Sequence, residues 1–177
     1  MLGIPLHPVF VHIPLGLSVV FPIVALGMTI ALWRGFLTQR AWVVAIALQA
    51  LILAGGLAAM KTGEKEEDRV ENLVGERRIE EHEERAEAFL WAAGVTLALS
   101  GTVVVLGPSA AVAAAGATTV ASLITLGLAY RVGHSGGELV YKYGAASAYA
   151  QPVVGAGAEG RGGGEEGGVR RGHDDDD

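Results

Sequence analysis

The first long apolar run of the chain opens with Leu6-His-Pro-Val-Phe-Val-His-Ile-Pro-Leu-Gly16. Histidine and proline each occur twice in this segment, at the start of a stretch without formal charge. An imidazole in hydrocarbon is costly unless it has a partner, and a proline inside a spanning helix frees a backbone carbonyl that must be satisfied elsewhere. We therefore expect this segment to take part in a site as well as to cross a bilayer.

The composition indicates a single-domain membrane protein. Of the 177 residues, 51% are hydrophobic and only 18% are charged, which differs from a typical soluble domain. The net charge of −6 resides mainly in residues 61–87 and in the tail after Gly155, so it gives no indication of nucleic-acid binding. The chain has no cysteine, which excludes disulfides, iron–sulfur clusters held by cysteine, thiolate zinc sites and covalent attachment of a c-type haem.

Four apolar segments are long enough to span a membrane, because a helix rises about 1.5 Å per residue and the hydrocarbon layer is about 30 Å thick. They cover residues 9–32, 41–60, 88–106 and 110–130. Short connections between them predict an all-α, integral membrane four-helix bundle with up-down-up-down topology. We assign residues 1–150 to this domain, and residues 151–177, rich in Gly, Asp and Glu, to a disordered tail.

A helical, acidic extramembrane segment is expected between the second and third spans. In residues 61–85 the apolar positions recur with helical spacing, and Gly75 is expected to bend the helix. The residues Val70, Leu73 and Val74 share one face before Gly75. His82 lies on an apolar stripe that continues into the third span, so it should point at the bundle. The alternative for the charged residues is a solvated face with i,i+4 pairs.

This topology brings four histidines to one membrane face, namely His7, His12, His82 and His134. The fifth, His173, belongs to the tail and is set aside. Along an ideal helix His7 and His12 are separated by about 7.5 Å in height and about 140° in direction. They cannot easily ligate one metal together, but each could meet a partner from another helix.

Imidazoles from separate helices of a membrane bundle are typical ligands of b-type haem. The leading hypothesis is an electron-transfer subunit with haem b, working between a quinone or redox partner and an extracytoplasmic acceptor. Its axial pair would be His82 and His134. Under this hypothesis His7 and His12 form a second pair, or join Arg85 and Arg131 in binding the haem propionates.

Two other classes of function stay open. A metal-binding or metal-handling protein would use His12, His82 and His134 for a divalent ion, with carboxylates from Glu83, Glu84, Glu87 or Glu138. A scaffold subunit without a cofactor would use its acidic helix to bind a partner protein. Each histidine taken singly also fits an interfacial side chain that reaches toward water. No serine or cysteine nucleophile with a positioned base can be recognised, so we expect a carrier or subunit, not a stand-alone enzyme.

The two end motifs, Leu6-His-Pro-Val-Phe-Val-His-Ile-Pro14 and Gly133-His-Ser-Gly-Gly-Glu-Leu-Val-Tyr141, resemble those of DUF2231, a family of bacterial membrane proteins. Members of this family look like four-helix proteins with a His-Pro-x-x-Val-His-Phe-Pro opening and a Gly-His-x-Gly-Gly close. Thr62-Gly63 and the lone His82 also fit, whereas Ile13 replaces Phe, and Lys142-Tyr143-Gly144 stands where members often carry His-Gly. Fusion of the domain to c-type cytochrome or Rieske modules in some members implies redox chemistry at the membrane.

The charges flanking the spans conflict about orientation in the bacterial inner membrane. Most basic residues lie on the histidine face, which the positive-inside rule would put in the cytoplasm. The first span, however, has no charge before it and two arginines, Arg34 and Arg40, after it, which puts the histidines outside. We favour the extracytoplasmic side, because the redox association agrees with it.

Overall fold

The computed structural model describes residues 6–149, and these residues form helices without any strand. The long helices are α1 (Leu6–Trp33), α2 (Val43–Glu64), α4 (Glu76–Val105) and α5 (Pro108–Tyr141), and α3 (Glu67–Val74) is a short one. Two 3₁₀ turns, η1 (Gln39–Trp42) and η2 (Ala145–Tyr149), complete the order. The prediction of an all-α fold with a helical segment between the second and third spans is confirmed. The predicted tail, 151–177, and His173 lie outside the described residues.

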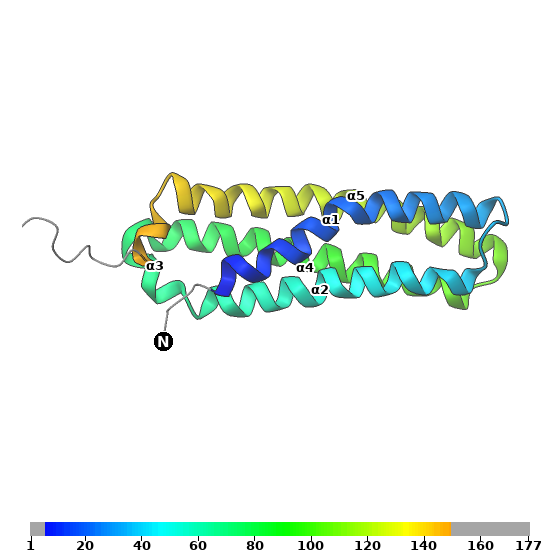
Figure 1. The fold of residues 1–177 in the computed structure, drawn as a ribbon, viewed down its shortest axis with the longest axis horizontal. Coiled ribbons are helices and arrows are strands. Elements are labelled where there is room, and N and C mark those ends of the chain that lie inside the picture. The colour runs from blue at the N-terminus through cyan, green and yellow to red at the C-terminus, as the bar shows by residue number, and fades with distance from the viewer. Residues whose placement is uncertain (1–5, 150–177) are drawn as a thin grey trace, which may run out of the picture.

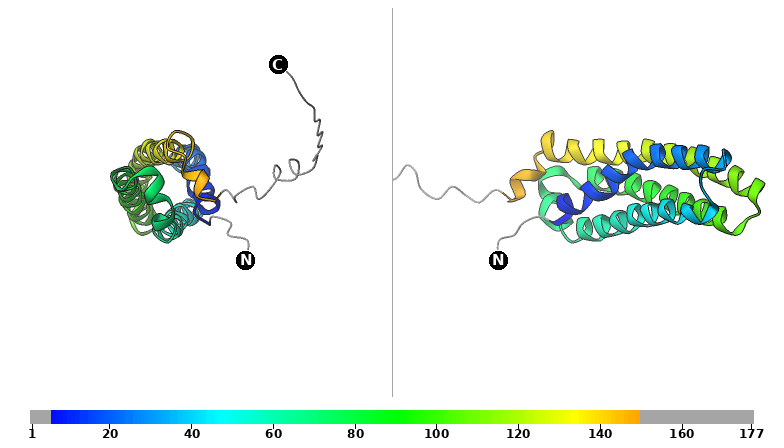
Figure 2. Two further views of the ribbon diagram at one scale, coloured as in Figure 1. Left: turned by 90° about the vertical axis from the view of Figure 1, so that its left-hand side faces the viewer. Right: turned by 45° about the vertical axis from the view of Figure 1, so that its right-hand side comes forward.

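The four long helices lie side by side as a ring (Figures 1 and 2). Helix α1 packs on α2 and α5, and α4 packs on the same two helices from the other side. Each of the four is long and apolar enough to cross a membrane. The apolar parts match the four predicted spans, but α4 and α5 continue well past them at the histidine end.

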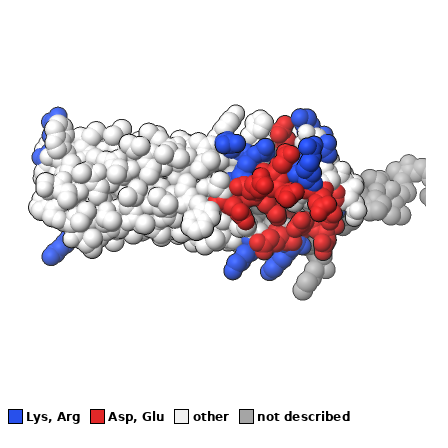
Figure 3. All heavy atoms as spheres, turned by 180° about the vertical axis from the view of Figure 1, so that it is seen from behind, with Lys and Arg blue, Asp and Glu red and all other residues white. Residues whose placement is uncertain are grey.

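The sides of the bundle are covered with large apolar side chains. Ile23, Trp91 and Val105 are 71%, 77% and 76% exposed, and most of the length of the bundle carries no charge (Figure 3). Such a surface is unfavourable in water and suited to lipid tails. Most of the charged residues gather at one end of the bundle, over α3 and the first turns of α4, and Arg34 and Arg40 lie at the other end.

Small and hydroxyl residues fill the interior. Trp42 Nε1 donates to Ser100 Oγ at 2.9 Å, and Gln49 Nε2 donates to the carbonyl of Ala93 at 3.0 Å. Gln49 of α2 thus makes a hydrogen bond to the backbone of α4. Small residues let membrane helices approach closely, and Gly56 of α2 shows this, since a Cβ there would lie 2.7 Å from Leu90 Cδ2 and 3.1 Å from Phe89 Cε1.

A cap made of α3 and η2 covers the histidine end of the bundle. Gly75, at φ +85°, ends α3 and lets the chain turn into α4. The cap has its own small core of Val74, Ile79 and Ala145. The predicted face holds for Val70 and Val74, but Leu73 is 51% exposed, because α3 contacts α4 and η2 along only a narrow face.

Glu66 ties this cap to the start of α1. Its Oε1 accepts the backbone N–H of Leu6 at 2.6 Å, and its Oε2 accepts the hydroxyl of Tyr149 at 2.8 Å. Burial, with the nearby Glu66 carboxylate, raises the pKa of Tyr149 to about 12, so the phenol stays a hydrogen-bond donor at neutral pH.

The close packing at Gly56 gives a test of the fold. We expect Gly56→Val to lower the free energy of unfolding by about 1–3 kcal/mol, because two branched methyl groups would push α2 away from α4. The matched control is Gly127→Val, at an exposed position of α5 where a Cβ would have no neighbouring atom within 4 Å. Unfolding in a detergent titration measures both, and equal stability of the two variants would contradict this packing.

Candidate functional site

Two histidines from different helices meet inside the capped end. The ring of His7, in the first turn of α1, lies with its centroid 6.3 Å from that of His82 in α4, and the two ring planes are 86° apart. Both residues are partly buried. His7 lies on the face of α1 that points into the bundle, together with Val11, Pro14 and Leu15.

Hydrogen bonds fix the orientation of both rings. His7 Nδ1 lies 2.7 Å from the carbonyl oxygen of Ala59. A carbonyl can only accept, so Nδ1 of His7 carries the proton. His82 Nδ1 lies 2.8 Å from Ser135 Oγ, and that hydroxyl already donates its single proton to the carbonyl of Val132 at 3.0 Å. Ser135 must therefore accept from His82 Nδ1.

In the neutral form of each ring, Nε2 is then a free lone pair. Burial lowers the pKa of His82 to about 4, so that ring is neutral at physiological pH. Metal-bound histidines in proteins are held in the same way, with the other ring nitrogen donating to a carbonyl, a carboxylate or another oxygen. The pair thus has the hydrogen-bonded support that an imidazole ligand requires.

The two imidazoles line one small, apolar cavity of about 50 Å³. Met60, in the last turns of α2, lines the same cavity, and no Asp, Glu, Lys or Arg of residues 6–149 does so. Glycines make room for the rings, since a Cβ on Gly63 would lie 3.1 Å from His7 Nδ1 and one on Gly136 would lie 3.2 Å from His82 Cε1. The cavity is therefore lined by two imidazole rings and a methionine side chain, in apolar and uncharged surroundings.

The other two predicted histidines lie outside this cavity. His12 is exposed on α1, and its Nδ1 donates to the carbonyl of Pro8. The side chain of His134 is 58% exposed, beside Tyr130 and 3.8 Å from Glu138 Oε2. Ser135, the next residue of α5 after His134, is buried and points into the bundle. The structure thus pairs His82 with His7, and it does not bring His134 to His82.

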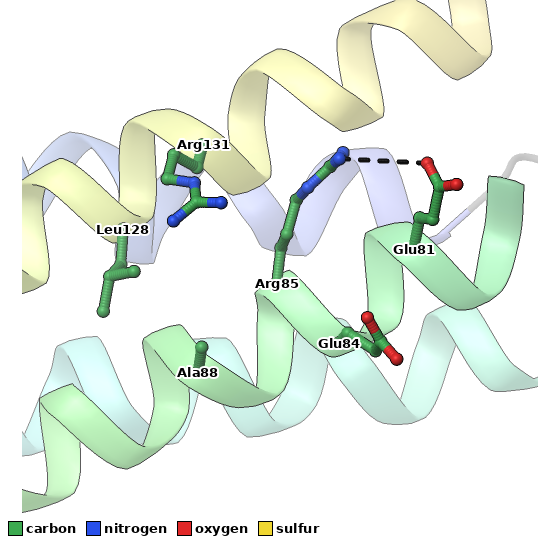
Figure 4. A pocket seen from close by; sticks show the side chains of 6 residues that line it. All are labelled: Glu81, Glu84, Arg85, Ala88, Leu128 and Arg131. Atoms are coloured by element: carbon green, nitrogen blue, oxygen red, sulfur yellow. Dashed lines mark ion pairs between the residues drawn. The ribbon is translucent and has the colours of Figure 1, made fainter.

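Arg85 and Arg131, expected together beside a haem, do lie together, but in another place. They line a cavity of about 280 Å³ between α4 and α5 (Figure 4). None of its lining residues is shared with the histidine cavity. Arg85 also pairs with Glu81 at 3.8 Å.

The predicted divalent-metal site with three or more ligands is not assembled in residues 6–149. In that part of the chain no three His, Asp or Glu side chains are close enough to hold a metal ion together. His12, His82 and His134 are on different faces, and the expected carboxylates, Glu83, Glu84, Glu87 and Glu138, line no cavity with the histidines.

Haem b does not fit the histidine cavity of this structure. Pockets that take cofactors and drug-sized molecules have volumes of about 300–1,000 Å³, and the space between the two rings and their neighbours is about 50 Å³. Two facing imidazoles are suitable axial ligands, but a porphyrin would require α1 and α4 to separate.

Ser135 and Met60 are the site residues that the sequence alone did not point to. The signal for Ser135 was available, because Ala129, Val132 and Ser135 recur with the spacing of one helical face. Met60 resembled any other apolar residue at the end of a span, and only the position of the cavity distinguishes it.

Comparison with known proteins agrees with the resemblance of the two end motifs. Residues 3–148 match the family described as "Predicted membrane protein (DUF2231)". No curated protein and no solved structure matches the chain. The match covers both histidines of the cavity and all four long helices, and the chain therefore belongs to the DUF2231 family of membrane proteins.

Proposed function

We propose that this protein is a metal-handling membrane protein that binds one Cu(I) ion between His7 and His82. The observation that carries the proposal is the pair of facing imidazoles, each with Nδ1 held by a hydrogen bond and Nε2 left as a free ligand. Their centroids are 6.3 Å apart, which leaves space for one ion between two nitrogens, each bound at about 2 Å.

The chemistry of the cavity favours Cu(I) over a divalent ion. The cost of taking an ion out of water rises steeply with its charge, and this cavity supplies no carboxylate to offset that cost. The thioether of Met60 is a soft ligand, and soft ligands select Cu(I), while imidazole binds copper in either oxidation state. Two imidazoles and one thioether make a neutral site suited to a monovalent, soft cation.

Haem is the main alternative, with an axial pair that differs from the predicted His82 and His134. In that case His7 and His82 would be the axial ligands of a b-type haem that exchanges electrons with a quinone or a redox protein. The volume of the cavity supports the single ion better, so we keep haem as an outcome of the test.

The test is Cu(I) binding by purified protein under anaerobic conditions, in competition with a coloured chelator. We expect one Cu(I) per chain, and an affinity at least tenfold lower in His7→Ala and His82→Ala, since loss of a ligand or of its support typically costs 10–100-fold. Met60→Leu, which conserves volume, should also weaken Cu(I) binding. The matched controls are His12→Ala and His134→Ala, whose rings lie outside the cavity.

Zinc and haem are measured with the same preparations. Equal loss of Cu(I) in the control variants would contradict the site. Tight Zn²⁺ binding that is unaffected by Met60→Leu would contradict the choice of ion. A sharp reduced α-band that is lost in His82→Ala would establish haem in its place, and circular dichroism shows whether each variant is folded.

The proposal includes a location, the bacterial inner membrane with the histidine end on the extracytoplasmic side. It rests on the first span, which has no charged residue before it and Arg34 and Arg40 after it. On this side the site would receive its ion from outside the cell membrane.

The absence of cysteine allows a direct test of orientation with single-cysteine variants. Ser147→Cys lies at the histidine end and Thr38→Cys at the opposite end, and both positions are exposed. We expect a membrane-impermeant maleimide to label Ser147→Cys in cells with a permeable outer layer and to leave Thr38→Cys unlabelled until the membrane is broken. Labelling in the reverse order would contradict this orientation.

A further inference from the structure

The cavity between α4 and α5 lies at the level where the apolar surface of the bundle ends. Its lining includes Ala88, where the uncharged stretch of α4 begins, and Leu128, near the end of the uncharged stretch of α5. Arg85 and Arg131 stand within one turn of these two residues, on the polar side. The cavity, of about 280 Å³, thus has an apolar floor toward the lipid tails and charged walls toward the headgroups.

The two arginines enter this space from opposite helices, Arg85 from α4 and Arg131 from α5 (Figure 4). Arg131 is exposed and makes no ion pair with residues 6–149. Arg85 lies 3.8 Å from Glu81 Oε2, longer than the 2.7–2.9 Å of a charge-assisted hydrogen bond. Both guanidinium groups therefore keep N–H donors for a phosphate, which arginine binds with two parallel hydrogen bonds.

Glu81 and Glu84 of α4 also line this cavity, and Glu81 lies on the side of Arg85 away from Arg131 (Figure 4). Two positive and two negative side chains give the lining no net charge, so it does not favour an anionic headgroup. The arrangement fits a zwitterionic headgroup, with phosphate near the arginines and a primary ammonium, which donates hydrogen bonds, near the glutamates.

We propose that this cavity binds the phosphoethanolamine headgroup of a membrane phospholipid, with Arg85 and Arg131 on the phosphate and Glu81 and Glu84 on the ammonium. The acyl chains would leave the cavity past Ala88 and Leu128 and join the bilayer along the groove between α4 and α5. This inference is independent of the metal site, since the two cavities share no lining residue.

The experiment is native mass spectrometry of the detergent-solubilised full chain, titrated with phosphatidylethanolamine, phosphatidylglycerol and phosphatidylcholine of the same acyl chains. We expect phosphatidylethanolamine to bind about tenfold more tightly than either of the others, because only it offers both a phosphate and a hydrogen-bonding ammonium. Equal affinity for the three lipids would overturn the proposal.

Two variants test the contact to the phosphate and the contact to the ammonium separately. Arg131→Gln should lower the affinity for phosphatidylethanolamine about tenfold. Glu84→Gln should lower it less and should remove most of the preference over phosphatidylglycerol. The matched control is Arg40→Gln, an exposed arginine at the opposite end of the bundle, which should bind like the wild type. If Arg131→Gln and Glu84→Gln also bind like the wild type, the site is wrong.

A final arm distinguishes a lipid from a soluble phosphate ester. Water-soluble phosphoethanolamine should compete only weakly with the lipid, because it lacks the acyl chains that lie along Ala88 and Leu128. Competition by phosphoethanolamine at the same concentration as the lipid would overturn the assignment to a membrane phospholipid.

Discussion

The close approach of two glycine positions to two imidazole rings is the constraint on which the histidine end of the bundle depends. A Cβ on Gly63 would lie 3.1 Å from the ring of His7, and one on Gly136 would lie 3.2 Å from the ring of His82. Any larger residue would move the rings or separate the helices. The glycines of α2 and α5 thus leave room for the rings, and α1 and α4 each place one imidazole in the space between α2 and α5.

The capped end also provides a hydrogen-bond partner for one nitrogen, Nδ1, of each ring. His7 uses the carbonyl of Ala59, and His82 uses the hydroxyl of Ser135. Deeper in the bundle, Ser100, Thr96 and the Nε2 of Gln49 also make hydrogen bonds across helices, and Gln49 Oε1 has no partner among residues 6–149. A bilayer offers no water for such pairing, and so the polar interior and the supported histidines have a common physical reason.

The sequence was sufficient for the fold because the main signals are local. Charge-free runs, short connections and the Gly75 break set the helices, and the apolar stripe through His82 correctly pointed that residue inward. The sequence did not identify the partner of His82, because His134 and Ser135 are neighbours in sequence and their side chains leave α5 about 100° apart. Whether the exposed or the buried one meets His82 depends on the rotation of α5, which only packing against α1 and α4 determines.

The second cavity illustrates the same limit. Arg85 and Arg131 were expected side by side, and both line one cavity. The prediction, however, placed them beside the histidines as ligands of the haem propionates. Their position between α4 and α5, apart from the histidines, follows from the ring of helices and could not be derived from spacing along the chain.

The central claim, that His7 and His82 present free Nε2 atoms to one bound ion, is tested most directly by ¹⁵N NMR of the protein labelled at histidine, before and after addition of Cu(I). Signals assigned with His7→Ala and His82→Ala should belong to rings protonated at Nδ1, and their Nε2 resonances should shift on addition of one equivalent of Cu(I), while those of His134 stay unchanged. Rings protonated at Nε2, or Nε2 resonances that do not respond to Cu(I), would contradict the account.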